Sequence, residues 1–251
     1  MVRCCGGAQN PAWIAVPGAL VEMLHERQAM ENLFFWLTLL LMAVDWIATR
    51  NCWRRVCWFA KPAPMITLII WFSLSGKWDG PLAAVGLGLV FSLLGDILLM
   101  LPARFFLAGM AAFLLTHLAY IFVFNQLPME FRWEILLPVA AAAGAFVFLM
   151  RRIRAGLRRR RQSGMLVPIG IYAVILSTMT LAALTTLLRP GWEPEAALVV
   201  SLGGVLFFLS DAVLAYHQFV ADVRQGDLLV MVSYHLAQLL IAGGTLEQFV
   251  F

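Results

Sequence analysis

Residues 82–101 read LAAVGLGLVFSLLGDILLML, an apolar run that contains a single charged residue, Asp96. A helix needs about 20 mainly apolar residues to cross the hydrocarbon core of a bilayer, and this run has that length. An aspartate inside such a helix costs about 3 kcal/mol on membrane-insertion scales, so it usually faces the protein interior. The run therefore predicts a transmembrane helix that makes a polar contact inside a bundle.

The composition of the whole chain agrees with this local pattern. Of its 251 residues, 62% are hydrophobic and 13% are charged, whereas soluble domains are about half apolar and a quarter charged. The sequence predicts an all-α polytopic membrane bundle of eight transmembrane helices. The expected spans are 32–49, 62–76, 82–101, 105–125, 133–150, 165–188, 196–219 and 227–246.

The basic residues between the spans predict the orientation of the bundle. Thirteen lysines and arginines fall in one set of loops and five on the other side, and seven of the thirteen lie in the loop 151–163. Because cytoplasmic loops carry the excess of basic residues, we expect this loop in the cytoplasm and both termini outside, in a bacterial inner membrane. Since the arginine run joins two apolar spans, its expected partner is anionic lipid headgroups and not nucleic acid.

The first 30 residues differ from the rest of the chain. They lack a cationic start followed by a continuous apolar core, so no standard signal peptide is expected. Because Met23 and Met30 precede the first span, we expect residues 1–30 to be a disordered tail or a mis-assigned start. Residues 31–251 then form one transmembrane domain. The cysteines form no CxxC pair and are expected to be free thiols: Cys4, Cys5, Cys52 and Cys57.

The segment around Asp96 has a counterpart 115 residues later in the chain. Residues 88–99 read GLVFSLLGDILL and residues 203–214 read GGVLFFLSDAVL, so that Asp96 aligns with Asp211. The span after each aspartate carries a histidine, His117 or His235. Because both aspartate-bearing spans run in the same direction, the pattern predicts a parallel repeat of four helices plus four.

These ionisable residues are expected to share one polar cavity that opens toward the cytoplasm. The candidates are Asp45, Lys61, Asp96, His117, Tyr120, Asp211, Tyr234, His235 and Gln238. Simpler readings stay open, since a buried Asp–His pair can serve only helix packing, Lys61 can anchor at the interface and Asp45 can be an end-of-helix residue. Two aspartates and two histidines can ligate a metal, but no helix carries HxxxH or HExxH, so we expect no metal and no cofactor.

Several of these residues lie in motifs that resemble a known family. The block LLGD at 93–96, followed by FLLTHLAY at 113–120, is similar to the core of the YhhN/TMEM86 family, the lysoplasmalogenases. Lys61-Pro62, FFLSD at 207–211 and Ala237-Gln238 match its other signatures. The resemblance covers residues 33–246. It departs from the family at His235, where an aromatic residue is usual, and in the arginine-rich loop and the first 30 residues.

The resemblance implies hydrolysis of the vinyl ether bond of lysoplasmalogen, a lysophospholipid, with water as the second reactant. Protonation of the vinyl β-carbon leaves an oxocarbenium ion, as in the related chemistry of glycoside hydrolysis by two carboxyl groups. Asp96 and Asp211 are then the catalytic acid/base pair, with either one as the acid, and Lys61 binds the lipid phosphate. The supporting residues are His117, Tyr120, Gln238, Tyr234 and His235, with Asp45 as a further candidate.

Two other classes of function fit the same residues. Parallel repeats and buried Asp/His pairs are also typical of small proton-coupled transporters. The matching positions of the two halves, however, carry no pair of helices interrupted by glycine and proline. The third reading is a lipid-binding membrane protein without catalytic activity.

Overall fold

A computed structural model describes residues 18–129 and 132–250, and this part of the chain is helical without a strand. Eight helical segments are long and apolar enough to cross a membrane, which confirms the predicted fold class and span number. The helices are α1 (Gly18–Arg50), α2 (Arg54–Ala60), α3 (Pro62–Ser75), α4 (Pro81–Met100), α5 (Phe106–Phe124), α6 (Leu136–Arg159), α7 (Leu166–Thr185), α8 (Pro194–Phe219) and α9 (Gly226–Val250). Short 3-10 turns precede α5, α6 and α7 and follow α7.

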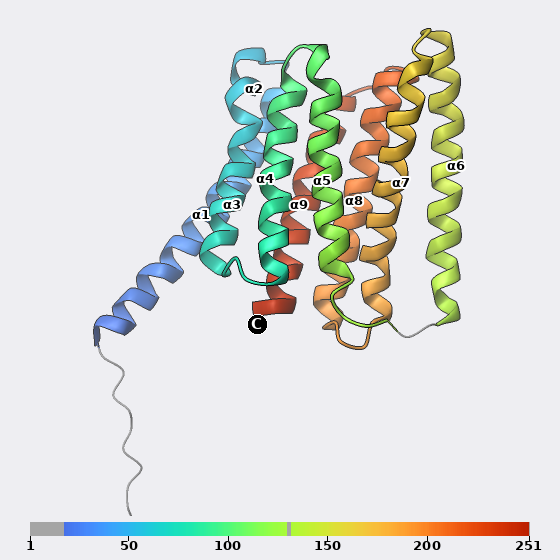
Figure 1. Cartoon of the computed structure of the whole chain (residues 1–251). Coiled ribbons are helices and arrows are strands. Elements are labelled where there is room, and N and C mark those ends of the chain that lie inside the picture. Colours follow the sequence, from blue (N-terminus) through green and yellow to red (C-terminus); the bar gives the residue numbers. More distant parts are fainter. Residues whose placement is uncertain (1–17, 130–131, 251) are drawn as a thin grey trace, which may run out of the picture.

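The helices run alternately up and down, and α2 and α3 together form the second span (Figure 1). Three of the helices, α3, α4 and α8, begin with proline, which lacks the N–H that would be unpaired at the first helical position. The C-terminal ends of α1, α4, α6 and α8 lie together at the upper end of the bundle in Figure 1. We call this the arginine-rich end, because Arg50, Arg104 and Arg151–Arg161 belong to it.

The structure differs from the prediction in two segments. Helix α6 continues to Arg159, so most of the expected loop 151–163 is helical. Arginine is a good helix former and is favourable at a helix C-terminus, and Ile153 and Leu157 pack against α7 and α8. Helix α1 begins at Gly18, so residues 18–30 are helical and not disordered, and the alternative of a mis-assigned start stays a prediction. Residues 1–17, with Cys4 and Cys5, lie outside the described residues, and Cys52 and Cys57 are free.

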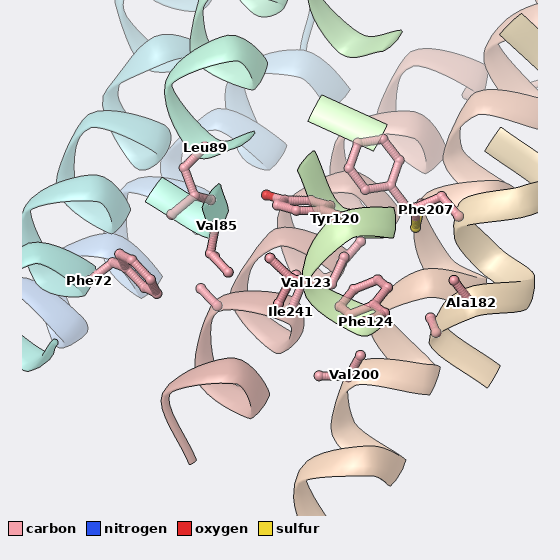
Figure 2. Packing of buried hydrophobic residues seen from close by; sticks show 14 of the residues in the cluster. Phe72, Val85, Leu89, Tyr120, Val123, Phe124, Ala182, Val200, Phe207 and Ile241 are labelled. Carbon is pink, nitrogen blue, oxygen red and sulfur yellow. The ribbon is translucent and has the colours of Figure 1, made fainter. Parts of the chain in front are cut away.

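Helix packing follows the order expected for two related halves. The most extensive contacts join α4 to α5 and α8 to α9, which are the third and fourth helices of each predicted half. The halves contact each other through equivalent pairs, α3 with α9 and α7 with α5. Figure 2 shows buried side chains from several of these helices meeting in one core, including Phe72, Leu89, Tyr120 and Ile241. The two halves therefore share one core.

Gly203 lies at a close approach between α8 and α9, where we expect stability to depend on side-chain volume. A Cβ atom there would lie 2.8 Å from Ile241 Cγ1 and 3.1 Å from the Ala237 carbonyl oxygen. Gly203→Val should therefore overpack the contact and lower the free energy of unfolding by about 1–3 kcal/mol. Thermal unfolding in detergent measures this effect. Gly144→Val is the control, because nothing lies within 4 Å of its added Cβ; equal destabilisation by both variants would contradict the prediction.

Candidate functional site

A cavity of about 810 Å³ opens at the arginine-rich end of the bundle. Its polar lining comes from the start of α3, the end of α4, the turn that follows α4, the turn between α6 and α7, and helices α8 and α9: Lys61, Asp96, Arg104, Gln162, Gln218 and Asp227. Its apolar lining includes Leu99, Phe106, Leu214, Phe219, Val230 and Met231. A cavity with cations and apolar walls is suited to an amphiphile that carries a negative charge.

Asp96 lies in the wall of this cavity and is 8% exposed. The Tyr234 hydroxyl on α9 donates a hydrogen bond of 2.7 Å to Asp96 Oδ2. Lys61, Asp45 and Asp211 lie close enough for their charges to act on this carboxyl group. The structure thus brings four of the predicted residues near Asp96, and Tyr234 makes the direct contact.

Asp211 lies in an adjoining, mainly apolar hollow of about 50 Å³ between α5, α7 and α8. The Tyr172 hydroxyl donates a hydrogen bond of 2.5 Å to Asp211 Oδ2. His117 Nε2 lies 3.0 Å from the Tyr172 oxygen and 3.4 Å from Asp211 Oδ2. Because Tyr172 gives its proton to Asp211, its oxygen can accept the Nε2–H of His117. The chain of donors therefore ends on Asp211.

The cavity and the hollow share part of their lining, and the shared residues are Leu99, Phe106, Leu214, Gln218 and Phe219. Asp96 lines the first compartment and Asp211 lines the second. The two aspartates therefore lie on either side of a junction between a polar and an apolar space. This arrangement matches a substrate whose reacting bond joins a polar headgroup to a hydrocarbon chain.

Tyr120 and Gln238 lie about one helical turn deeper and bind each other instead of an aspartate. The Tyr120 hydroxyl donates to Gln238 Oε1 at 2.7 Å, and Gln238 Nε2 donates to Ser92 Oγ at 2.6 Å. Ser92 in turn lies 3.1 Å from Thr116 Oγ1. This buried network joins α4, α5 and α9 beneath the aspartates, and it can orient the helices that carry them.

His235 on α9 and Asp45 on α1 are both fully buried and lie outside the cavity and the hollow. Trp46 Nε1 donates a hydrogen bond of 3.1 Å to His235 Nδ1. Neither carboxylate oxygen of Asp45 has a hydrogen-bond partner among the described residues. Lys61 lies near enough for its charge to act on Asp45 and on His235. His235 therefore does not touch either of the paired aspartates.

The sequence analysis missed Tyr172, Ser92, Trp46 and Arg104. The chain has only four tyrosines, and three of them, Tyr120, Tyr172 and Tyr234, hydrogen-bond inside the bundle. Scarce tyrosines in mid-span were thus a signal that could have pointed to Tyr172. The described residues contain no group of three or more His, Cys, Asp or Glu side chains placed to hold a metal ion.

Comparisons with known proteins place these residues in a family. The YhhN family model matches residues 56–245. The chain belongs to the YhhN family. The match confirms the resemblance seen in the sequence, and it includes Lys61, Asp96, His117 and Asp211. Asp45 and Trp46 lie before the matched YhhN region.

Relatives of this YhhN-family chain include two human proteins named lysoplasmalogenases and a bacterial membrane protein. Human lysoplasmalogenase TMEM86B is 32% identical over 193 residues, covering 74% of this chain and 75% of the relative. Human lysoplasmalogenase TMEM86A is 28% identical over 214 residues, covering 78% and 85%. The uncharacterized membrane protein YhhN of Escherichia coli O157:H7 is 32% identical over 95 residues, covering 38% and 45%. No solved structure matches the chain.

Proposed function

We propose that this chain is a lysoplasmalogenase-like hydrolase that cleaves a vinyl ether bond, releasing a fatty aldehyde and a glycerophospho-headgroup. Two relatives that each align with about three quarters of the chain are named lysoplasmalogenases. The observation that carries the proposal is the position of Asp96 and Asp211, which line adjoining polar and apolar compartments. In a lysoplasmalogen the vinyl ether bond lies at the same kind of junction.

The lysolipid is placed by its two chemically different ends. Its phosphate binds in the larger cavity, where Lys61 and Arg104 supply positive charge. The first carbons of its alkenyl chain enter the hollow between Phe113, Ile169 and Ala215. The vinyl ether then lies between the two aspartates, in a space that excludes most water. A single-chain lipid can reach this position sideways from the bilayer, with its tail still in the membrane.

We give the two aspartates different roles, and the extra histidine in the network around Asp211 supports this choice. Asp211 accepts from the chain of His117 and Tyr172 and acts as the carboxylate, whereas Asp96 has Tyr234 as its donor and acts as the acid. Asp96 gives its proton to the vinyl β-carbon, and the C=C electron pair forms the new C–H bond. Asp211 stabilises the oxocarbenium ion and takes a proton from the attacking water. The hemiacetal then breaks its C–O bond, and its hydroxyl proton passes to the leaving glycerol oxygen.

The orientation in the membrane follows from the arginine-rich end. Arg151, Arg154 and Arg158 are exposed on the last turns of α6, where they can contact anionic headgroups. We therefore place this end in the cytoplasm and both ends of the described chain outside. The substrate cavity then opens to the cytoplasmic leaflet of the membrane, which in a bacterium is the inner membrane.

Lys61 should contribute mainly to substrate binding. A hydrogen bond to a charged group contributes about 1.5–3 kcal/mol, so Lys61→Ala should raise KM for a lysoplasmalogen about 10–100-fold and change kcat little. Lys61→Arg is the matched variant, because it keeps the charge, and it should retain a KM close to that of the wild type. Aldehyde release at varied substrate concentration measures both constants. An unchanged KM in Lys61→Ala would contradict the role of Lys61 in phosphate binding.

The proposed activity itself is tested with purified protein in detergent. The protein is incubated separately with a lysoplasmalogen and with an acyl lysophospholipid of the same headgroup. Free aldehyde from the first substrate and no fatty acid from the second is the expected result. Transport of the lysolipid into proteoliposomes without aldehyde would instead favour a transporter, and binding without turnover or transport would favour a lipid-binding protein.

A further inference from the structure

Asp227 is a charged side chain of the cavity that the proposed reaction does not use. It lies in the first turn of α9, is exposed, and lines the cavity together with Lys61 and Arg104. None of the ion pairs among the described residues includes Asp227 or either of these cations. A carboxylate is favourable at a helix N-terminus, but that alone does not explain why it lines the same cavity as two cations. The cavity therefore offers unpaired charges of both signs to a ligand.

Helix α9 carries Asp227 and Tyr234 on the same face. Tyr234 is the residue that donates a hydrogen bond to Asp96, and residues at positions i, i+3, i+4 and i+7 share one face of a helix. Val230 and Met231, which occupy the intermediate positions, also line the cavity. At 1.5 Å per residue, Tyr234 lies about 10 Å further along the helix than Asp227. Because α9 begins at the arginine-rich end, Asp227 lies near the mouth of the cavity and Asp96 lies at its inner end.

The length of an ethanolamine lysolipid headgroup fits this separation. About nine bonds join the ether oxygen to the nitrogen, and an extended chain advances about 1.2 Å per bond, which gives about 11 Å. A lipid whose vinyl ether lies at Asp96 therefore brings its nitrogen to the level of Asp227. Its phosphate then lies between these two levels, in the cavity that Lys61 and Arg104 line.

We propose that Asp227 binds the ammonium group of the lipid headgroup and makes the site select ethanolamine over choline lysolipids. This inference rests on the proposed hydrolase function. A primary ammonium has N–H donors, which Asp227 and the side-chain oxygens of Gln162 and Gln218 can accept in the same cavity. A trimethylammonium group has no such donor and is typically bound by aromatic rings. Among the described residues, the aromatic lining is Phe106 and Phe219, which also line the hollow and so lie away from the mouth.

The selection should appear in the kinetics of aldehyde release. In the wild type, kcat/KM should be at least about tenfold higher for an ethanolamine than for a choline lysoplasmalogen with the same alkenyl chain, because choline forms no hydrogen bond with Asp227. Asp227→Asn should raise KM for the ethanolamine substrate about tenfold and make the two substrates nearly equal. Asp227→Glu keeps the charge and should retain most of the preference. Asp222→Asn is the matched control, because Asp222 is exposed between α8 and α9 and does not line the cavity; it should keep the wild-type ratio.

Binding of saturated ether lysolipids gives a readout that does not depend on turnover. Isothermal titration calorimetry in detergent compares the ethanolamine and choline forms on the wild type, Asp227→Asn and Asp222→Asn. The ethanolamine form should bind at least about tenfold more tightly, and only Asp227→Asn should lose the difference. Equal affinities in the wild type, binding of neither form, or a difference that survives in Asp227→Asn would overturn the role of Asp227. A preference that depends on Asp227 in a protein that releases no aldehyde would refute the hydrolase proposal alone.

Discussion

Asp96→Asn should reduce aldehyde release from a lysoplasmalogen by at least about a thousandfold. General acid catalysis contributes about 10²–10⁴-fold to such reactions, and an asparagine amide cannot donate the proton that the vinyl carbon needs. Asparagine has nearly the shape of aspartate and can still accept the hydrogen bond from Tyr234. The loss should therefore appear in kcat, with binding of the lysolipid preserved.

Asp211→Asn should cause a comparable loss for a different reason. An amide is neutral, so it neither stabilises the oxocarbenium ion nor takes a proton from water. Both variants are measured as purified protein in detergent, with the expression level and the thermal unfolding temperature matched to the wild type. Ser201→Ala is the control, because Ser201 is buried on α8 and hydrogen-bonds the Ala183 carbonyl away from the site. Full activity in both aspartate variants would refute the assignment of the pair.

The transmembrane fold could be predicted from the sequence because lipid imposes a simple rule on composition. A spanning helix must be apolar along its whole length and satisfy its backbone internally, so hydropathy alone located all eight spans. Hydropathy does not predict where a helix ends once the helix extends beyond the hydrocarbon core of the bilayer. Arg151–Arg159 have the composition of a loop between spans but continue α6, because contacts of Ile153 and Leu157 hold these turns in place.

Only part of the site could be predicted from the sequence. Ionisable residues in the spans were found, whereas an aromatic residue of the site was not. Asp96, Asp211 and His117 were found because charged and ionisable groups are rare in apolar spans. Tyr172 was missed because a tyrosine ring is unremarkable in such a span, and only the fold shows that its hydroxyl meets Asp211. Tyr120 and Gln238 were expected to orient an aspartate, yet they hydrogen-bond each other. Helix spacing predicts which face of a helix a side chain lies on, but it does not predict which residue that side chain contacts.

The pairing between the halves also required the structure. In the sequence, each aspartate precedes a helix with its own histidine, so Asp96 is closest to His117 along the chain. In the fold, Asp211 of the second half lies beside His117 of the first, and Asp96 of the first half lies beside Tyr234 of the second. The halves thus complete each other's aspartate sites. The spacing of a predicted repeat gives equivalent positions, but not that each aspartate takes its partner from the other group of four spans.

Hydrolysis in heavy water should place one deuterium on carbon 2 of nearly every aldehyde molecule. The reason is that the acid proton of Asp96, which exchanges with solvent, becomes a carbon-bound hydrogen in the step that breaks the C=C bond. The aldehyde is reduced to the alcohol as it forms, so that later exchange through the enol adds no label. Mass spectrometry of the alcohol then counts the deuterium atoms.

The same reaction in water enriched in ¹⁸O identifies the bond that breaks. Attack on the oxocarbenium carbon leaves the original oxygen on glycerol, so the glycerophospho product should contain no ¹⁸O. Nucleophilic attack at the glycerol carbon would put the label there and release an enol, which also takes up one deuterium at carbon 2 as it becomes the aldehyde, so the position of the ¹⁸O separates the two routes. A saturated ether lysolipid is the matched control, because it has no double bond to protonate; it should occupy the cavity and inhibit, yet give no product. Label on glycerol, or turnover of the saturated ether, would rule out protonation by Asp96 as the step that starts the reaction.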